Sequence, residues 1–122
     1  MNKTVGNFTF IETPIKGVYE IEVKKYGDNR GYFMETYKKK DFDEAGLVYN
    51  FIQDNQSKSK KGVLRGLHFQ KTYPQAKLVR CIEGEVFDVC VGHTTPTSNG
   101  KPQRPSTWVL ISACWASASP VA

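Results

Sequence analysis

Hydrophobic and polar residues alternate along much of the chain with a period of two. The clearest example is the stretch 19–24, in which the apolar Tyr19, Ile21 and Val23 are each followed by a charged residue. Successive side chains of a β-strand point to opposite faces, so this pattern predicts a half-buried strand with one face in water. Residues 26–31 have the composition of a turn and residues 32–37 resume an extended run, which predicts a hairpin.

Further short segments have strand-like composition, and they are residues 51–55, 64–70, 78–82 and 85–91. The last two flank Glu83 and Gly84, a pair typical of a tight β-hairpin. One short helix is predicted over residues 41–45, with Asp41 as its N-cap and Gly46 at its C-terminal end. Many short strands with one brief helix predict an all-β sandwich or jelly roll.

Length and composition indicate a single globular domain. A chain of 122 residues is long enough to bury a core. No apolar run approaches the ~18 residues of a membrane span, and residues 1–10 lack the apolar centre of a signal peptide, so we expect a cytoplasmic protein without a membrane partner. Cys81, Cys90 and Cys114 form an odd set without C-x-x-C spacing, which predicts free thiols.

The formal net charge of +5 indicates an acidic partner. Lysine clusters at 38–40 and 58–61 would suit a nucleic-acid backbone, whereas Arg30, Arg65 and Lys77 would suit one small phosphorylated ligand. No zinc-finger, helix-turn-helix or RNP-type aromatic pattern accompanies the lysines. We therefore expect a phosphorylated small molecule, and no nucleic acid, as the ligand.

Residues 62–84 resemble the metal-binding motif of a cupin with its metal ligands replaced. His68 follows Gly62 at the usual distance, but Gln70 stands at the second histidine position and Lys77 at the carboxylate position. An ammonium group repels a divalent cation, and an amide is a poor substitute for imidazole. The sequence therefore predicts no metal and no cofactor, and it leaves one histidine and one lysine for acid-base chemistry.

Four motifs carry a more specific resemblance. They are DNRGYFME at 28–35, QDNQSKSK at 53–60, VLRGLHFQ at 63–70 and QAKLVR at 75–80, followed by EVFDV at 85–89. In this order and spacing they resemble the dTDP-4-dehydrorhamnose 3,5-epimerase family over about residues 12–91. That family acts in dTDP-L-rhamnose biosynthesis and inverts the two carbons beside a 4-keto group without a cofactor. The resemblance implies a cupin-like jelly roll with its core in residues 1–91.

The resemblance implies two catalytic residues. His68 matches the family's general base, a role that suits an imidazole with an ordinary pKa of ~6.5 because it is unprotonated at neutral pH. Lys77 matches the residue that stabilises the enolate oxygen, where a fixed positive charge meets developing negative charge. The structural alternatives are a hydrogen-bonded core histidine and a surface lysine.

The resemblance also implies a binding site for a dTDP-4-keto-6-deoxyhexose. Arg65 matches an arginine on the nucleotide-sugar side of the pocket, where a guanidinium fork fits a diphosphate. Gln53, Asp54 and Asn55 match the stretch that contacts the nucleotide, where amides can read the edge of a thymine ring.

Two further matched residues imply a homodimer. Arg30 and Glu35 correspond to family residues that reach the nucleotide of a neighbouring subunit by strand exchange. Each has a plainer alternative, since Arg30 could pair with Asp28 inside a turn and Glu35 could be a solvent-facing strand residue.

Residues 92–122 do not continue the family pattern. This stretch has no acidic residue, both tryptophans and four of the six prolines. The family's tyrosine general acid, its aspartate that orients the histidine and its Ala-His-Gly-Phe motif have no counterpart here. We expect an atypical tail with at most one strand followed by disorder, as an altered reading frame or truncation would produce.

That departure leaves the predicted jelly roll incomplete at its C-terminus and predicts impaired proton transfer. A non-catalytic nucleotide-sugar-binding or dimerisation module is one alternative function. A related dTDP-sugar 3,4-ketoisomerase is another.

Overall fold

The computed structural model describes residues 2–66, 68, 75–90 and 109–113. These residues form seven strands and one helix. The elements are β1 (Asn2–Val5), β2 (Phe8–Glu12), β3 (Tyr19–Val23), β4 (Lys25–Asp28), β5 (Gly31–Met34), α1 (Lys39–Glu44), β6 (Ala76–Arg80) and β7 (Val109–Ala113). The predicted all-β class with one short helix is therefore confirmed.

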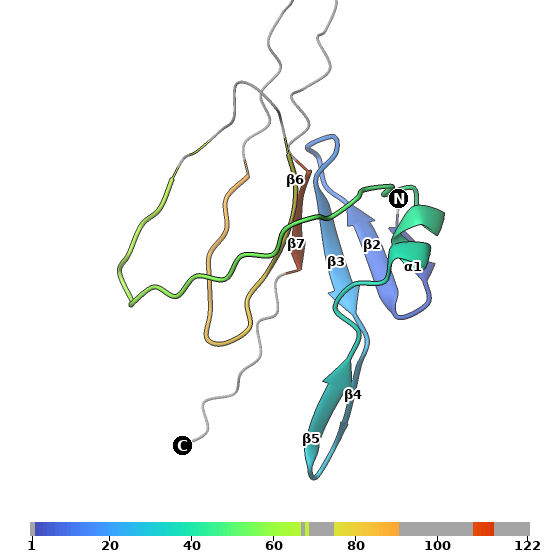
Figure 1. Cartoon of the computed structure of the whole chain (residues 1–122), viewed down its shortest axis with the longest axis horizontal. Coiled ribbons are helices and arrows are strands. Elements are labelled where there is room, and N and C mark those ends of the chain that lie inside the picture. The colour runs from blue at the N-terminus through green and yellow to red at the C-terminus, as the bar shows by residue number, and fades with distance from the viewer. Residues whose placement is uncertain (1, 67, 69–74, 91–108, 114–122) are drawn as a thin grey trace, which may run out of the picture.

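Five strands make the main sheet, in the order β1-β2-β3-β7-β6 (Figure 1). Strands β1, β2 and β3 form an antiparallel meander, and their register places Phe10 opposite Ile21. Strand β7 lies parallel to both β3 and β6. The meander is thus made of strands that are consecutive in sequence, whereas β6 and β7, on its β3 side, are distant from it in sequence.

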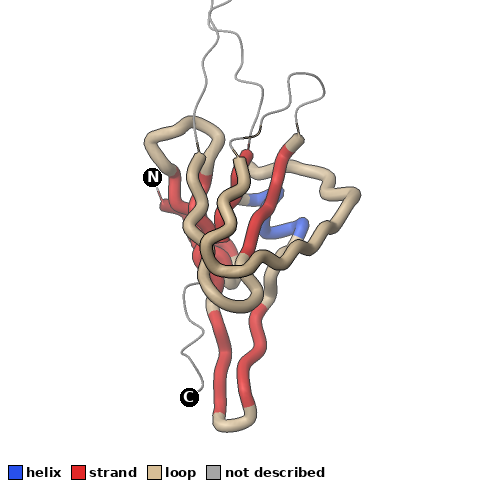
Figure 2. The backbone as a smooth tube through the Cα atoms, turned by 90° about the vertical axis from the view of Figure 1, so that its left-hand side faces the viewer, coloured by secondary structure: helices blue, strands red, loops and turns tan. Residues whose placement is uncertain are grey.

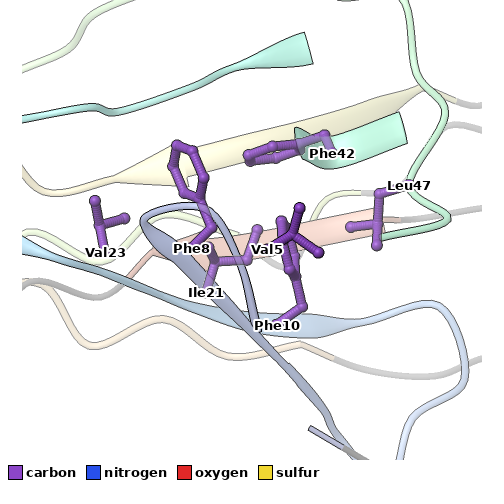
Figure 3. Close-up of a cluster of buried hydrophobic side chains, with 7 residues drawn as sticks. All are labelled: Val5, Phe8, Phe10, Ile21, Val23, Phe42 and Leu47. Atoms are coloured by element: carbon purple, nitrogen blue, oxygen red, sulfur yellow. The ribbon is translucent and has the colours of Figure 1, made fainter. Parts of the chain in front are cut away.

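The hydrophobic core lies on one face of the meander, beneath α1 (Figure 3). Its buried members are Val5, Phe8, Phe10, Ile21, Val23, Phe42 and Leu47. Phe42 meets the rings of Phe8 and Phe10 edge-on, with centroids 5.2 and 5.0 Å apart. Such edge-to-face contacts add to the free energy gained by burying the rings.

The alternation predicted for residues 19–23 is confirmed. Ile21 and Val23 are buried while Glu20 and Glu22 are exposed, and the strand ends at Val23, one residue before the end of the predicted stretch. One face of β3 therefore contributes to the core and the other faces water.

The predicted helix exists, but its start was placed wrongly. It begins at Lys39, and the N-cap is Lys38, which makes no capping hydrogen bond through its side chain. Asp41 lies inside the first turn and is buried, because the docking of the adjacent Phe42 against the sheet fixes that turn. Gly46 follows the helix with φ +93°, a conformation that suits glycine at a helix end.

The predicted turn over residues 26–31 was too wide. Strands β4 and β5 pair from Lys25 opposite Met34 to Asp28 opposite Gly31, which leaves only Asn29 and Arg30 in the turn. Tyr26 lies opposite Phe33, and such an aromatic pair stabilises a hairpin. This two-stranded sheet extends away from the main sheet in both views (Figures 1 and 2).

Several predicted strands are absent from the described residues. Residues 51–55 and 85–90 are not strands, nor are the described positions 64–66 and 68 of the segment 64–70. The turn at Gly84 forms with φ +80°, but only its first arm is a strand, β6, which spans 76–80 rather than 78–82. Leu64 and Phe87 are each 93% exposed, and a strand-like sequence remains a loop when no neighbouring strand pairs with it.

The predicted tail lies largely outside the described residues. Strand β7 falls within it, while the boundary after Val91 and the predicted disorder fall on residues that the structure does not describe. The division at residue 91 stays a prediction. Cys81 and Cys90 are free thiols as predicted, and Cys114 is outside the described residues.

Candidate functional site

Lys77 lies on β6, an outer strand of the main sheet. Its neighbours Ala76 and Leu78 pack against the core. Successive side chains of a strand point to opposite faces, so Lys77 belongs to the face away from the core, and it is exposed. The strand thus presents an ammonium group to solvent from a fixed backbone.

His68 is exposed and lies outside any helix or strand. The alternative of a buried core histidine is therefore wrong. Residues 67 and 69–74 around it, including Gln70, are outside the described residues. The structure leaves the imidazole accessible to a ligand.

The nucleotide-side residues lie on the long exposed segment that follows α1. The side-chain amide of Gln53 donates a hydrogen bond to Oδ1 of Asn55 at 3.1 Å. Further along, Nε of Arg65 donates to Oγ of Ser59 at 3.1 Å. These contacts order individual side chains, and Ser59 is a partner that the motif comparison did not single out.

Arg30 is held by Asp28 at the β4–β5 turn. Its Nη2 and Nε donate to Oδ2 of Asp28 at 2.7 and 3.1 Å, and its backbone N–H donates to Oδ1 at 2.8 Å. The alternative interpretation of Arg30, an ion pair within a turn, is therefore what this chain shows. Hydrogen bonds from the guanidinium, and then from the backbone N–H of Arg30, hold the pKa of Asp28 below its usual value of 3.8.

Glu35 follows directly after β5 and is half-buried. Its Oε2 atom is inaccessible to solvent and has no hydrogen-bond partner among the described residues. A shielded carboxylate oxygen without a donor is costly, so this position is not an ordinary solvent-facing strand residue. That alternative for Glu35 is wrong.

Two of the predicted site residues, Arg30 and Lys77, lie in different parts of the fold. The hairpin that carries Arg30 extends away from the main sheet, whereas Lys77 lies within that sheet (Figures 1 and 2). Within one chain, the turn at Arg30 is therefore apart from β6.

The described part of the chain contains neither a metal-binding cluster nor a membrane-spanning helix. No cluster of three or more His, Cys, Asp or Glu side chains there is arranged to hold a metal ion. The described helix, α1, has six residues, and no described helix is long and apolar enough to cross a membrane.

Comparison with known families gives the decisive observation. The family model described as dTDP-4-dehydrorhamnose 3,5-epimerase matches residues 12–99, which is most of the chain. The chain belongs to the dTDP-4-dehydrorhamnose 3,5-epimerase family. All eight residues predicted for the site lie within this matched range, and the resemblance inferred from the sequence motifs is confirmed.

Curated relatives in this epimerase family agree. A dTDP-4-dehydrorhamnose 3,5-epimerase of Methanothermobacter thermautotrophicus is 55% identical over 87 residues, covering 71% of this chain and 47% of the relative. The enzyme of the same name from Shigella flexneri is 58% identical over 83 residues, covering 66% and 46%. A dTDP-4-dehydrorhamnose 3-epimerase of Streptomyces niveus is 46% identical over 79 residues, covering 63% and 38%.

The match to the epimerase family is partial in length. The chain spans just under half the length of the first two of these relatives. No solved structure matches the chain.

Proposed function

We propose that this chain acts on a dTDP-4-keto-6-deoxyhexose by the chemistry of a 3,5-epimerase, without a metal or cofactor. The family match over residues 12–99 carries this proposal. The imidazole of His68 takes the proton from C3, and the electron pair of that C–H bond moves toward the 4-keto oxygen. The ammonium of Lys77 stabilises the resulting enolate.

Reprotonation on the opposite face completes an inversion, and it needs an acid. The family's tyrosine acid has no counterpart among the residues after Val91. Loss of a general acid typically lowers a rate by about 10²- to 10⁴-fold. We therefore propose that the chain exchanges the proton at C3 or C5 with solvent faster than it inverts either carbon.

Incubation of the chain with the keto-sugar nucleotide in D₂O tests this proposal. We expect deuterium at C3, C5 or both, measured by proton NMR, with little product of inverted configuration. Net inversion at the rate of a full-length relative, or no exchange by a chain shown by circular dichroism to be folded, would contradict it. The position of the deuterium also separates the two activities named among the relatives, since a 3-epimerase labels C3 alone.

We further propose a jelly roll completed by a homodimer, with the β4–β5 hairpin as the exchanged element. An isolated two-stranded hairpin is marginally stable in water. Tyr32 and Phe33 on this hairpin are 62% and 69% exposed, and a partner subunit would cover them. Such a dimer would bring Arg30 and Glu35 to the neighbour's site.

Sedimentation analysis of Phe33→Asp against the unaltered chain tests the dimer. Phe87→Asp is a matched control, because Phe87 is exposed but lies off the hairpin. We expect Phe33→Asp to shift the protein to monomer and Phe87→Asp to leave the dimer intact. A monomeric unaltered chain at high concentration would refute the dimer.

The missing tyrosine acid favours one second candidate, a module that binds the nucleotide sugar without reacting. Calorimetric binding of dTDP without any deuterium exchange would support that candidate. The ketoisomerase alternative would instead move the keto group from C4 to C3, which the carbon NMR spectrum of the product reveals.

A further inference from the structure

Within the described part of the chain, the guanidinium of Arg30 is held along one edge. Nε and Nη2 form that edge, and both donate to the single oxygen Oδ2 of Asp28, at 3.1 and 2.7 Å. The other carboxylate oxygen accepts the backbone N–H of Arg30 at 2.8 Å. One carboxylate therefore fixes both the turn and the side chain that leaves it.

A second edge of the same guanidinium has no hydrogen-bond partner in the part of the chain that the structure describes. Arginine has five N–H donors in a planar fork, and Nη1 with the remaining hydrogen of Nη2 forms an end that Asp28 does not occupy. The side chain of Arg30 is 87% exposed, so this end faces solvent. Two parallel N–H groups on such an end match two oxygens of a phosphate group.

The surroundings favour an anion at this open end. Residues 24–34 carry Lys24, Lys25 and Arg30 against the single acidic Asp28. The ammonium groups of Lys24 and Lys25 lie 5.0 and 3.9 Å from the ring centroids of Tyr26 and Tyr32, which keeps both cations on the hairpin. The hairpin therefore presents a positively charged surface.

We propose that Asp28 is a positioning residue, which holds the guanidinium of Arg30 side-on so that its free end receives a phosphate group of the ligand. This inference rests on the nucleotide-binding role proposed above for Arg30. Without Asp28, the long side chain of Arg30 would sample many rotamers, and binding would have to order it. Asp28 itself does not touch the ligand.

Asp28 could instead weaken binding, because its negative charge lies near the bound phosphate. Salt screens the repulsion, and it also screens the exposed ion pair that fixes the orientation of Arg30. The two effects therefore differ in sign: removing the repulsion should tighten binding, whereas removing the fixed orientation should weaken it. The geometry favours the orienting effect, since the carboxylate occupies the edge of the fork that points back toward its own turn.

Calorimetric binding of dTDP and of inorganic pyrophosphate, at low salt and in 0.5 M salt, tests the proposal. Asp28→Asn keeps an oxygen for the backbone N–H of Arg30 but cannot accept from the guanidinium with its amide nitrogen. Arg30→Lys keeps the charge and removes the fork. Asp43→Asn is the matched control, because Asp43 accepts a similarly short ion pair from Lys39, at 2.7 Å, elsewhere on the surface.

We expect Asp28→Asn to weaken dTDP binding by about three- to tenfold at low salt, which is what ordering one long side chain on binding costs, and by less in 0.5 M salt. Arg30→Lys should weaken it to a similar extent, and Asp43→Asn should leave it unchanged. The melting temperature of Asp28→Asn should stay near that of the unaltered chain, because an exposed ion pair contributes little to stability. A purely structural role would instead move melting temperature and affinity together.

Equal or tighter binding by Asp28→Asn, with the unaltered chain still binding dTDP, would overturn the positioning role and leave the proposed function standing. If the unaltered chain bound neither dTDP nor pyrophosphate, the nucleotide-binding part of the proposed function would fall, and the positioning role with it.

Discussion

The backbone of Gly6 packs directly against the carboxylate of Asp41. A Cβ atom added at Gly6 would lie 3.1 Å from Cγ of Asp41, and closer still to Oδ2. Gly6 forms the turn between β1 and β2 with φ +58°, and Asp41 is buried in the first turn of α1. This contact is where the helix meets the meander, so the absence of a side chain at Gly6 is a packing requirement as well as a backbone one.

Replacing Gly6 with alanine should therefore destabilise the protein by two separate effects. A left-handed backbone costs a residue other than glycine about 1–2 kcal/mol. The clash with Asp41 adds about 1–3 kcal/mol, the usual range for overpacking. We expect the free energy of unfolding, measured with urea, to fall by the sum of these two costs.

Gly17→Ala provides the control for the backbone effect, because Gly17 has φ +86° and nothing within 4 Å of an added Cβ. The double variant Gly6→Ala with Asp41→Ala should recover the clash term. Equal destabilisation by Gly6→Ala and Gly17→Ala would show that Asp41 does not press on the turn.

Phe42→Ala should remove the contact that joins α1 to the sheet. Phe42 is 1% exposed, and its ring lies edge-on to Phe8, Phe10 and Tyr37. Loss of a buried phenylalanine costs about 3–5 kcal/mol, which is a large part of the stability of a small domain. We expect loss of cooperative thermal unfolding, whereas Phe33→Ala on the exposed hairpin should change the melting temperature of the monomer little.

Substitution of either proposed catalytic residue should slow deuterium incorporation, whereas substitution of an exposed lysine elsewhere should not. His68→Asn should lower the rate of deuterium incorporation by about 10²- to 10⁴-fold through loss of the base. Lys77→Met should lower it by about 10²- to 10³-fold through loss of the oxyanion partner. Lys16→Met removes an exposed charge outside the site and should exchange at the unaltered rate; a comparable loss there would discredit the assignment of Lys77.

The ion pair at the β4–β5 turn should give a distinct pH dependence. Because the pKa of Asp28 is lower in the folded chain than its usual value of 3.8, its contribution is fully present above 3.8 and is lost as the pH falls through the lower, folded value. Carboxyl carbon NMR should show a midpoint for Asp28 below 3.8. Arg30→Ala should move that midpoint upward, and an unchanged midpoint would mean that Arg30 does not hold the carboxylate.

Segments whose neighbours are close in sequence were predicted well. Strand β3 matches the predicted stretch to within one residue, because its alternation reflects one face in the core and one in water. The helix and the β4–β5 hairpin were also found, with errors of a few residues where Asp41 and Tyr26 took part in packing or pairing instead of ending an element.

Segments whose pairing depends on distant parts of the chain were not predicted well. Residues 51–55 and 85–90 have strand composition, yet within the described residues they have no neighbouring strand. Parallel pairing of β6 with β7 was not predicted either, because nothing local in 76–80 specifies a partner at 109–113. The roles of the candidate site residues came from the resemblance of the motifs to a known family. The sequence offered the ion pair between Asp28 and Arg30 only as an alternative interpretation of Arg30.

The distribution of the core along the chain has a consequence for the order of folding. The buried residues of the core cluster fall between Val5 and Leu47. Contacts between residues close in sequence form early because they close short loops. Strand β7 is far from β3 in sequence, so placing it between β3 and β6 requires closing a long loop. We therefore expect the meander and α1 to form early in folding, and we expect the amide hydrogens of β2 and β3 to exchange with solvent more slowly than those of β6.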